Sequence, residues 1–303
     1  IFGFALDLFV SLQENTTLPM ETKEQLIDRL LDLAFAEDIG DGDHTTLSTI
    51  PATATGRQHL LVKEDGIIAG VEIAGKVFNR LDPALKMEVL IADGTPVRKD
   101  DVASVVEGPV RSLLIAERTM LNIMQRMSGI ATTTARYQAE LDGLDCKVLD
   151  TRKTTPGMRM LEKEAVRIGG GFNHRIGLFD MILIKDNHVD FAGGIPQAVA
   201  RAKEYCHENG KDLRIEVEVR NTEEIEQALE AEVDRIMLDN FTPERTAEAV
   251  KLIRGKNPAV EIESSGGITI DNLRAYGMAG VDFISVGALT HSVKGLDMSF
   301  KAC

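Results

Sequence analysis

The chain has 303 residues, of which 44% are hydrophobic and 27% are charged, a balance typical of a globular protein with one large domain or two ordinary ones. Its formal net charge of −14 argues against general nucleic-acid binding, because such binding needs a basic surface that displaces the counterions of phosphate. The cysteines Cys146, Cys206 and Cys303 are far apart and form no CxxC pair. This argues against a disulfide framework or a zinc cage, and it predicts a cytoplasmic protein.

The first 19 residues have the apolar character of a signal peptide but not its layout. They lack a basic segment at the start, contain Asp7, and have an apolar run too short to span a bilayer. A helical spacing of leucines starts only after Met20, within ETKEQLIDRLLDLAFAEDIG. We therefore expect residues 1–19 to be an upstream extension or an artefact without a role in the site.

Two different patterns of apolar residues divide the rest of the chain into two regions. From about residue 45 to 112, short apolar runs between Gly and Asp-Gly breaks predict a small sheet, with a helix around 71–81. A long helical pattern follows at 113–143, where Met120, Met124 and Met127 are expected in the core rather than at a cofactor. The first region therefore reads as α+β.

After the long helix, β-branched apolar runs alternate with helices, which predicts a parallel sheet with βα crossovers. The predicted strands are 146–151, 181–185, 213–219, 235–240, 260–265 and 283–289. Start signals support the helices between them, namely Asn221 with Glu224, Thr242 before Pro243, and Thr269. Because six βα units fall short of eight, an incomplete barrel is the first choice and a doubly wound sheet the second.

Polar residues stand at the carboxyl ends of these strands, where barrel enzymes have their active sites. They are Thr151, Arg152, Lys153, Lys185, Glu218, Asp239, Ser264, Ser265, Gly266, Gly267 and Gly287. Any one of them could simply be where a strand meets water, but the whole set would converge on one mouth. With His174 and Arg175 from a nearby loop, the cations predict a site for a polyanion.

Two further features refine this site. Glu218 and Asp239 suit Mg²⁺, which takes oxygen ligands, although they could instead neutralise the neighbouring cations. Gly266 and Gly267 precede a helix, and Gly287 follows the last strand, so backbone N–H groups there could hold a phosphate. A Gly-Gly pair also occurs in ordinary turns, but the last two strands are the common phosphate site of barrels.

Six motifs taken together resemble the quinolinate phosphoribosyltransferases, also called nicotinate-nucleotide pyrophosphorylases (carboxylating). The motifs are TRKT at 151–154, NHR at 173–175, LIKDNH at 183–188, EVEV at 216–219, MLDN at 237–240 and ESSGGI at 263–268. The resemblance runs in order from about residue 25 to 300. It implies an α/β fold with an N-terminal open-faced α/β sandwich at 20–135, to which 290–303 return, and an incomplete six-stranded barrel at 136–289.

The resemblance also implies a role for each candidate residue. Arg118 would reach into the site of the neighbouring subunit of a homodimer, and Thr151, Arg152, His174, Arg175 and Lys185 would bind quinolinate. Lys153, Glu218 and Asp239 would be catalytic, around phosphoribosyl pyrophosphate and its Mg²⁺, with Glu218 and Asp239 as metal ligands. The 5′-phosphate would lie against Ser265, Gly266, Gly267, Gly287 and His291, with Lys153 nearby.

The implied reaction transfers a phosphoribosyl group to quinolinate with loss of CO₂, giving nicotinate mononucleotide and pyrophosphate in NAD biosynthesis. No nucleic-acid or membrane partner is expected. Three alternatives stay open at this point: a related transferase that uses a different acid, an aldolase with Lys185 as Schiff-base lysine, and a phosphometabolite sensor without turnover.

Overall fold

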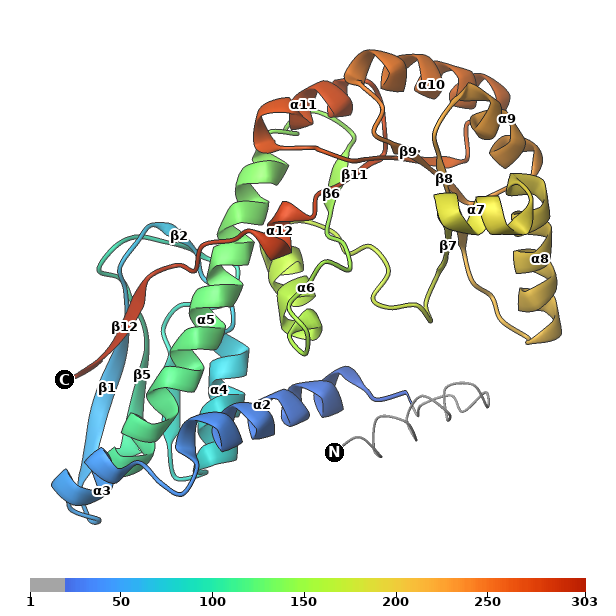
Figure 1. Cartoon of the computed structure of the whole chain (residues 1–303). Coiled ribbons are helices and arrows are strands. Elements are labelled where there is room, and N and C mark those ends of the chain that lie inside the picture. The colour runs from blue at the N-terminus through green and yellow to red at the C-terminus, as the bar shows by residue number, and fades with distance from the viewer. Residues whose placement is uncertain (1–19) are drawn as a thin grey trace.

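The computed structural model describes residues 20–303, so the interpretation of residues 1–19 lies outside the described part of the chain. Within it, the structure contains a four-stranded sheet, a six-stranded sheet and a two-stranded ladder. Figure 1 shows the four-stranded sheet and its helices on one side and an arc of strands and helices on the other, with the long helix α5 (Val110–Ala139) between them.

The predicted helix after Met20 is α2 (Lys23–Ile39), and it buries Ile27 and Leu31. It begins with a capping box, in which the side chain of Thr22 accepts from the N–H of Gln25 and the Gln25 side chain accepts from the N–H of Thr22. A short helix, α3 (His44–Thr49), follows and is capped by Asp43. The acidic stretch before α3 therefore ends in a helix cap.

The N-terminal sheet has the strand order β12-β1-β5-β3, and its pairs are antiparallel. Its strands are β1 (Thr55–Val62), β3 (Lys86–Val89), β5 (Val102–Pro109) and β12 (Met298–Ala302). The ladder joins β2 (Gly66–Ile67) to β4 (Pro96–Val97). Helices α4 (Val71–Leu81) and α5 pack together beside the sheet, and Phe78 of α4 contacts Phe300 of β12. The last strand thus closes a layer that the first strands begin.

The long helix α5 supplies much of the core at this junction. Met120, Met124 and Met127 are buried, which confirms their predicted place in the core. At Gly129 a Cβ atom would lie 2.2 Å from the carbonyl oxygen of Lys294, so only glycine lets the segment before β12 cross α5 this closely.

The C-terminal sheet has the order β6-β11-β10-β9-β8-β7, and all of its pairs are parallel. Its strands are β6 (Lys147–Leu149), β7 (Ile182–Ile184), β8 (Ile215–Val219), β9 (Arg235–Asp239), β10 (Glu261–Ser265) and β11 (Phe283–Ser285). The helices are α6 (Arg159–Ile168), α7 (Asp186–Ala192), α8 (Ile195–Glu208), α9 (Thr222–Glu230), α10 (Pro243–Lys256), α11 (Ile270–Met278) and α12 (Ala288–His291).

This strand order confirms the incomplete barrel and shows that the doubly wound alternative is wrong. A doubly wound sheet reverses its order at a switch point, whereas here each strand from β7 to β11 lies beside its successor in the chain and β6 joins β11. The ring stays open between β6 and β7, where Leu149 forms a single bridge to Phe172. Phe172 begins the segment that carries His174 and Arg175 and leads to β7.

The predicted helix starts are confirmed, with one difference in detail. Thr242 caps α10 with Pro243 in its first turn, Thr269 caps α11, and the Asn221 side chain accepts from the N–H of Glu224. The Glu224 carboxylate accepts from the N–H of Arg220, one residue earlier than a standard capping box. Within residues 20–303, no helix is long and apolar enough to cross a membrane.

Candidate active site

The polar residues predicted at the strand ends do gather at the carboxyl edge of the parallel sheet. Register places Ser265 beside Asp239 on neighbouring strands, and Glu218 beside Met237, two residues before Asp239. Side chains two residues apart in a strand point to the same face, so Glu218 and Asp239 share a face on adjacent strands. The mouth therefore has cations at the ends of β6 and β7, the two outer strands of the sheet. Its acids lie at the ends of β8 and β9, between them.

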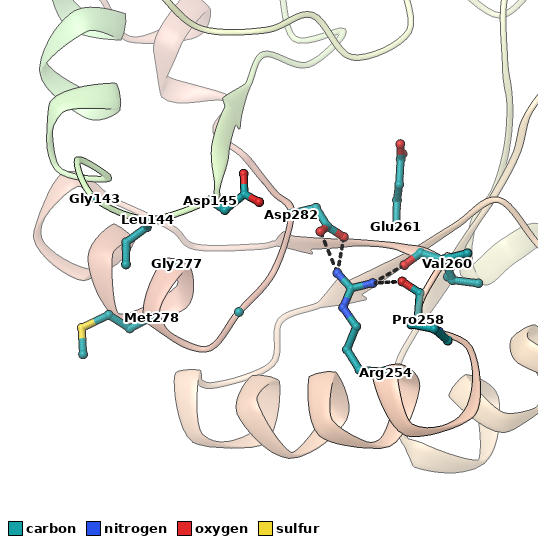
Figure 2. A pocket seen from close by; sticks show the side chains of 12 residues that line it. Gly143, Leu144, Asp145, Arg254, Pro258, Val260, Glu261, Gly277, Met278 and Asp282 are labelled. Atoms are coloured by element: carbon teal, nitrogen blue, oxygen red, sulfur yellow. Dashed lines mark hydrogen bonds and ion pairs between the residues drawn. The ribbon is translucent and has the colours of Figure 1, made fainter.

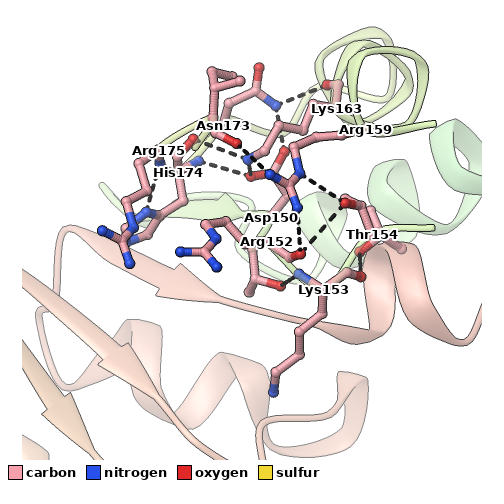
Figure 3. Close-up of polar contacts among 12 residues, drawn as sticks. Asp150, Arg152, Lys153, Thr154, Arg159, Lys163, Asn173, His174 and Arg175 are labelled. Atoms are coloured by element: carbon pink, nitrogen blue, oxygen red, sulfur yellow. Dashed lines mark hydrogen bonds and ion pairs between the residues drawn. The ribbon is translucent and has the colours of Figure 1, made fainter. Parts of the chain in front are cut away.

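Arg152 and Arg175 form the cationic centre of this mouth (Figure 3). The Nε atom of Arg152 is buried and has no hydrogen-bond partner, while Arg175 donates from Nη1 to the carbonyl of Met181 at 3.3 Å. Burial and then the charge of Arg152 lower the pKa of Arg175. Two guanidinium groups that repel each other in a partly buried place favour a dianionic ligand between them.

The loop that carries Arg175 is fixed to the end of β6 by a buried polar cluster (Figure 3). Asp150 accepts from the side chain of Lys163 and, at 2.5 Å, from the Nδ2 atom of Asn173. Burial raises the pKa of Asp150 and lowers that of Lys163, although their mutual attraction opposes both shifts. Neither Asp150 nor Lys163 is among the predicted site residues, because each acts through a contact that local sequence does not reveal.

Arg159 of α6 joins the segment that carries Arg152 to the segment that carries Arg175. It donates to the Thr154 hydroxyl at 3.0 Å, to the carbonyl of Arg152 at 3.3 Å, and to the carbonyl of Ile176 at 3.2 Å. The strand end of β6 and the loop after His174 are thereby joined through one guanidinium. Sequence analysis missed this residue too, since a helical arginine gives no signal of its own.

The acids of the mouth already have partners. Lys185 donates from Nζ to Glu218 Oε2 at 2.9 Å, and Asp239 accepts from the side chain of Asn240 at 2.5 Å. Glu218 is mostly buried and Asp239 is half-buried. Two carboxylates on one face beside a solvent-filled mouth fit Mg²⁺, which is usually held by one or two acids plus substrate oxygens and water.

Glycines shape the end of β10 into a concave turn. Gly266 and Gly267 both have positive φ angles, +96° and +61°, and a Cβ atom on Gly266 would lie 2.3 Å from Asn240 Oδ1. Among the described residues, the backbone N–H groups of Gly266 and Gly267 make no hydrogen bond, and neither does that of Gly287. Free N–H groups at two neighbouring strand ends can bind a phosphate.

Lys153 and His291 lie next to this turn on its β11 side. A Cβ atom on Gly287 would be 3.0 Å from His291 Nε2 and 3.2 Å from the Cδ atom of Lys153. The hydroxyl of Thr290 donates to the carbonyl of Lys153 at 2.8 Å, which ties α12 to the end of β6. Figure 3 shows the Lys153 side chain extending away from the arginines.

Beneath the mouth, Glu216, Arg235 and Glu263 form a buried polar cluster, here called the floor, that sequence analysis did not predict. His174 Nε2 is 3.0 Å from Glu216 Oε2 and 3.6 Å from Glu263 Oε2, and Arg235 donates to Glu263 Oε2 at 3.0 Å. Burial and then the charge of Glu216 raise the pKa of Glu263 to about 8, and burial raises that of Glu216 to about 7. Burial lowers the pKa of His174. The signal was present in EVEV, where alternation puts Glu216 on the same face as Glu218.

His174, Glu216 and Glu263 are close enough to be considered as metal ligands, since their ligand atoms lie within 4.8 Å of one another. Arg235 already supplies a positive charge to Glu263, and both carboxylates are fully buried. A neutral imidazole with a partly protonated acid pair accounts for the same contacts without an ion. The mouth acids remain the better fit to a metal.

Arg118 is a predicted site residue for which no side-chain contact is found within residues 20–303. It is exposed on α5, and none of the hydrogen bonds or ion pairs found within residues 20–303 involves it. Eight residues later on α5, Arg126 does reach the barrel, where it pairs with buried Glu162 at 2.9 Å. Arg118 is therefore free to contact something outside this chain.

A cavity of about 600 Å³ lies at the opposite, amino ends of the parallel strands (Figure 2). Arg254 crosses it and donates to both carboxylate oxygens of Asp282 at 2.6 Å and to the carbonyl of Val260 at 2.6 Å. The charge of Arg254 is satisfied within the protein, and none of the predicted site residues lines the cavity. In barrel folds this end contributes to stability rather than chemistry.

Comparison with known proteins agrees with this geometry. Residues 43–128 match the family described as Quinolinate phosphoribosyl transferase, N-terminal domain, and residues 130–301 match its C-terminal domain. The chain belongs to the quinolinate phosphoribosyltransferase family. The junction of the two matches falls inside α5, the helix that joins the N-terminal sheet to the barrel.

Individual relatives cover nearly the whole chain. The chain is 45% identical over 289 residues to quinolinate phosphoribosyltransferase [decarboxylating] 1b of Nicotiana tabacum, covering 90% of this chain and 81% of that protein. It is 45% identical over 288 residues to the chloroplastic nicotinate-nucleotide pyrophosphorylase [carboxylating] of Arabidopsis thaliana, with the same coverage of 90% and 81%. The solved nicotinate-nucleotide pyrophosphorylase of Francisella tularensis superposes with a TM-score of 0.87 at 40% identity, covering 95% of this chain and 100% of that one.

Proposed function

We propose that this protein is an enzyme that transfers the phosphoribosyl group of 5-phosphoribosyl 1-pyrophosphate to quinolinate and removes CO₂, giving nicotinate mononucleotide and pyrophosphate in NAD biosynthesis. The observation that carries the proposal is that Arg152, Lys153 and Arg175 form no ion pair among the described residues, in a chain of net charge −14 that belongs to this family. Both substrates are polyanions, so each would supply the charges that the mouth lacks.

Quinolinate has two adjacent carboxylates, and we propose that the neighbouring guanidinium groups of Arg152 and Arg175 bind them. The Arg152 guanidinium has a buried Nε atom without a partner, and it lies beside that of Arg175. Thr151 and Lys185 border the same region from the ends of β6 and β7. We propose that these groups orient the pyridine nitrogen toward the ribose, since fixed orientation removes much of the entropy cost of reaction.

Phosphoribosyl pyrophosphate would lie along the other side of the mouth. The N–H groups of Gly266, Gly267 and Gly287 are proposed to hold its 5′-phosphate, with Ser265 and His291 at the edge and Lys153 reaching the pyrophosphate. Glu218 and Asp239 would hold Mg²⁺, which when bound neutralises the charge that accumulates on the departing pyrophosphate. For Glu218 this requires Lys185 to exchange its carboxylate partner for a substrate group.

The bond changes follow from this arrangement. Attack of the pyridine nitrogen on ribose carbon 1 expels pyrophosphate, and the nitrogen becomes positively charged. That charge stabilises the electron pair left at ring carbon 2 when its carboxylate departs as CO₂, and uptake of one proton at carbon 2 completes nicotinate mononucleotide. Lys153 and the arginines act by electrostatic stabilisation, which is worth about 3 to 4 kcal/mol for one well-placed donor.

We also propose that the site is completed by a second copy of this chain. Two observations support a homodimer: Arg118 is exposed and has no side-chain partner among the described residues, and large apolar side chains that follow site residues in the chain are exposed. Leu178 and Phe191, which follow Arg175 and Lys185 in the chain, are 72% and 92% exposed. Clusters of exposed large apolar side chains mark protein interfaces in soluble proteins.

The dimer has a direct test. Arg118→Ala and Lys185→Ala chains should each be inactive alone, and mixing them with subunit exchange should restore part of the activity, because some mixed dimers contain one intact site. Sedimentation of the separate variants checks that both still associate. No recovery after verified exchange would contradict a shared site.

We propose a reducing compartment as the location, with the cytoplasm as our first expectation. The three cysteines are free, and Cys146 is buried, where desolvation raises the pKa of its thiol to about 12. The Arabidopsis relative is named chloroplastic, so an organelle is the competing location. Cell fractionation with an antibody to this protein decides between them.

The reaction is tested by incubating the protein with quinolinate, phosphoribosyl pyrophosphate and Mg²⁺, following phosphorus NMR and product mass. We expect pyrophosphate and nicotinate mononucleotide from quinolinate, and none when nicotinate replaces it. Turnover with a different acid alone would move the protein to another substrate. Tight binding of both ligands without product would overturn the enzymatic assignment.

A further inference from the structure

All four polar atoms of His174 are directed at the protein rather than at the mouth. Its backbone N–H donates to Asp150 Oδ1 at 2.9 Å, and its carbonyl accepts from Lys163 Nζ at 3.1 Å. Its ring Nδ1 accepts from the backbone N–H of Arg175 at 2.7 Å. Its Nε2 is buried beside the carboxylates of the floor without an aligned hydrogen-bond partner, so no side-chain nitrogen of the residue is exposed to the mouth.

The contact at Nδ1 fixes the tautomer of the ring. A nitrogen that accepts a hydrogen bond carries no proton, so in the neutral imidazole Nε2 holds the hydrogen. That Nε2–H lies 3.0 Å from Glu216 Oε2, one of several oxygens in the floor that lack an aligned donor. Neither Nε2 nor the Glu216 oxygens have an aligned partner, so this approach is an electrostatic contact and not a formed hydrogen bond.

The floor is rigid because neighbouring strands supply it. Glu216 is on β8, Arg235 on β9 and Glu263 on β10, all facing the barrel interior, and both carboxylates are 0% exposed. Arg235 joins Glu263 at 3.0 Å and stacks over the ring of Phe283, 4.3 Å from its centroid. A ring held against this floor cannot easily turn toward the mouth.

Arg175 is the residue that this arrangement positions. It follows His174 directly, and its backbone N–H ends on the His174 ring. The chain beyond it is also anchored, because Asp180 accepts from the N–H groups of Ile176 and Gly177 at 2.7 and 2.8 Å. The backbone of Arg175 is thus fixed on both sides, while its guanidinium is held at one nitrogen by the Met181 carbonyl.

We infer that His174 is a positioning residue, held by Glu216 and Glu263, that fixes the backbone of Arg175 so that its guanidinium faces the first substrate beside Arg152. This rests on the proposed function, and it differs from the role implied by the family resemblance, in which His174 itself binds quinolinate. Glu216 and Glu263 thereby acquire a role in substrate binding without touching the substrate. The acceptor at Nδ1, rather than a charge on the ring, is the part of His174 that matters.

Two substitutions separate the nitrogen atoms. His174→Asn keeps an acceptor near the place of Nδ1, whereas His174→Gln puts its amide near the place of Nε2. We expect His174→Asn to keep the KM for quinolinate within about threefold of wild type, and His174→Gln and His174→Ala to raise it about tenfold or more, as for loss of a buried hydrogen bond. The KM for phosphoribosyl pyrophosphate should change by less than about threefold in all three variants.

Glu216→Leu tests the floor independently and should raise the KM for quinolinate as His174→Ala does. Glu226→Leu is the control, because Glu226 pairs with Lys256 between α9 and α10 and has no contact with the floor. Thermal unfolding of each variant identifies general loss of stability, and equal increases in both KM values would show only a structural role. That pattern would overturn the inference. A lower KM for quinolinate in His174→Gln than in His174→Asn would overturn it as well.

A spectroscopic readout does not depend on turnover. Nitrogen-15 NMR of histidine-labelled protein should show His174 with a protonated Nε2 and a bare Nδ1, both unchanged when quinolinate is added. A ligand-dependent change at Nε2 would establish direct contact and overturn the inference. Failure of wild-type protein to convert quinolinate would sink the proposed function instead, while the free-protein tautomer would still test the positioning of Arg175.

Discussion

The two ends of the parallel sheet carry similar charges but satisfy them differently. At the amino ends, Arg254 is paired with Asp282, and Arg214 and Arg235 share Glu261. At the carboxyl ends, the buried Nε atom of Arg152 has no partner, and Arg152 and Arg175 repel each other. Because an unpaired cation in a partly buried place costs free energy, its retention at one end only indicates that a ligand supplies the missing charge there.

The contrast also explains why the cavity at the amino ends is not the candidate site. The cavity at the amino ends has the volume for a ligand, but its arginine is fully engaged by the protein. The mouth instead offers free N–H groups and free guanidinium hydrogens. Unmet hydrogen-bonding capacity distinguishes a binding site from a structural hollow more reliably than volume does.

The largest expected effect comes from replacing one arginine with alanine at each end of the parallel sheet. Arg152→Ala should lower kcat/KM by about 100-fold or more with little change in stability, because it removes a donor that only the substrate uses. Arg254→Ala should leave the activity of folded enzyme near wild type but lower the free energy of unfolding by about 1 to 2 kcal/mol, since Asp282 loses its partner. Steady-state kinetics and denaturant unfolding measure both, and the opposite pattern would remove the distinction between the two ends.

A second comparison stays within the mouth. Arg175→Ala should raise the KM for quinolinate about tenfold or more, but the KM for phosphoribosyl pyrophosphate much less, because the two ligands use different sides of the mouth. Arg274→Ala is a suitable control, since that arginine donates to the carbonyls of Glu140 and Asp142, in the segment that leads to the amino end of β6. Isothermal titration with each ligand measures binding directly, and equal losses for both ligands would contradict the assignment.

The glycine turn allows a smaller and more specific test. Gly266→Ala should weaken binding of phosphoribosyl pyrophosphate several-fold and lower stability by about 1 to 2 kcal/mol, because its Cβ atom would strike Asn240 at a positive φ angle. Gly193→Ala imposes a similar φ angle, +89°, but meets no neighbour within 4 Å. If both variants bind the substrate equally, the turn does not hold the phosphate.

The smallest effect concerns the buried floor and the pH dependence of stability. Glu263 has its pKa raised from 4.5 to about 8, chiefly by burial and also by Glu216, while His174 and Arg235 oppose the shift. The folded protein thus keeps a proton that the unfolded chain has released, and the free energy of unfolding should fall as pH rises from about 4.5 to about 8. Glu263→Gln should flatten this slope in melting curves, and an unchanged slope would exclude Glu263 as its source.

Much of the fold could be predicted because its signals are local. The period of apolar residues gave the strands, and Thr242 with Pro243 marks the start of α10 from adjacent residues alone. The mouth was also predictable, because parallel strands bring their carboxyl ends to one edge whatever the details of packing. Arg152, Lys185 and Asp239 needed only a count of residues from the strands that precede them.

The supporting residues could not be found in the same way. Asp150 and Lys163 depend on a contact between a strand end and a helix, and Arg126 depends on α5 crossing beside α6. Glu216 was within reach, since it alternates with Glu218 along β8, but its partner Glu263 lies on another strand. Nothing in the local pattern shows that a histidine faces such a pair rather than a ligand.

The pairing of β12 with β1 has a consequence for how the protein is made. Leu60 lies opposite Phe300, so an edge of the N-terminal sheet stays unpaired on the ribosome until almost all of the chain in between has been translated. Unpaired strand edges invite pairing with other chains, and late, distant pairing slows folding. Nascent chains of this protein should therefore depend on chaperones most while the barrel is being synthesised, well after the N-terminal strands have left the exit tunnel.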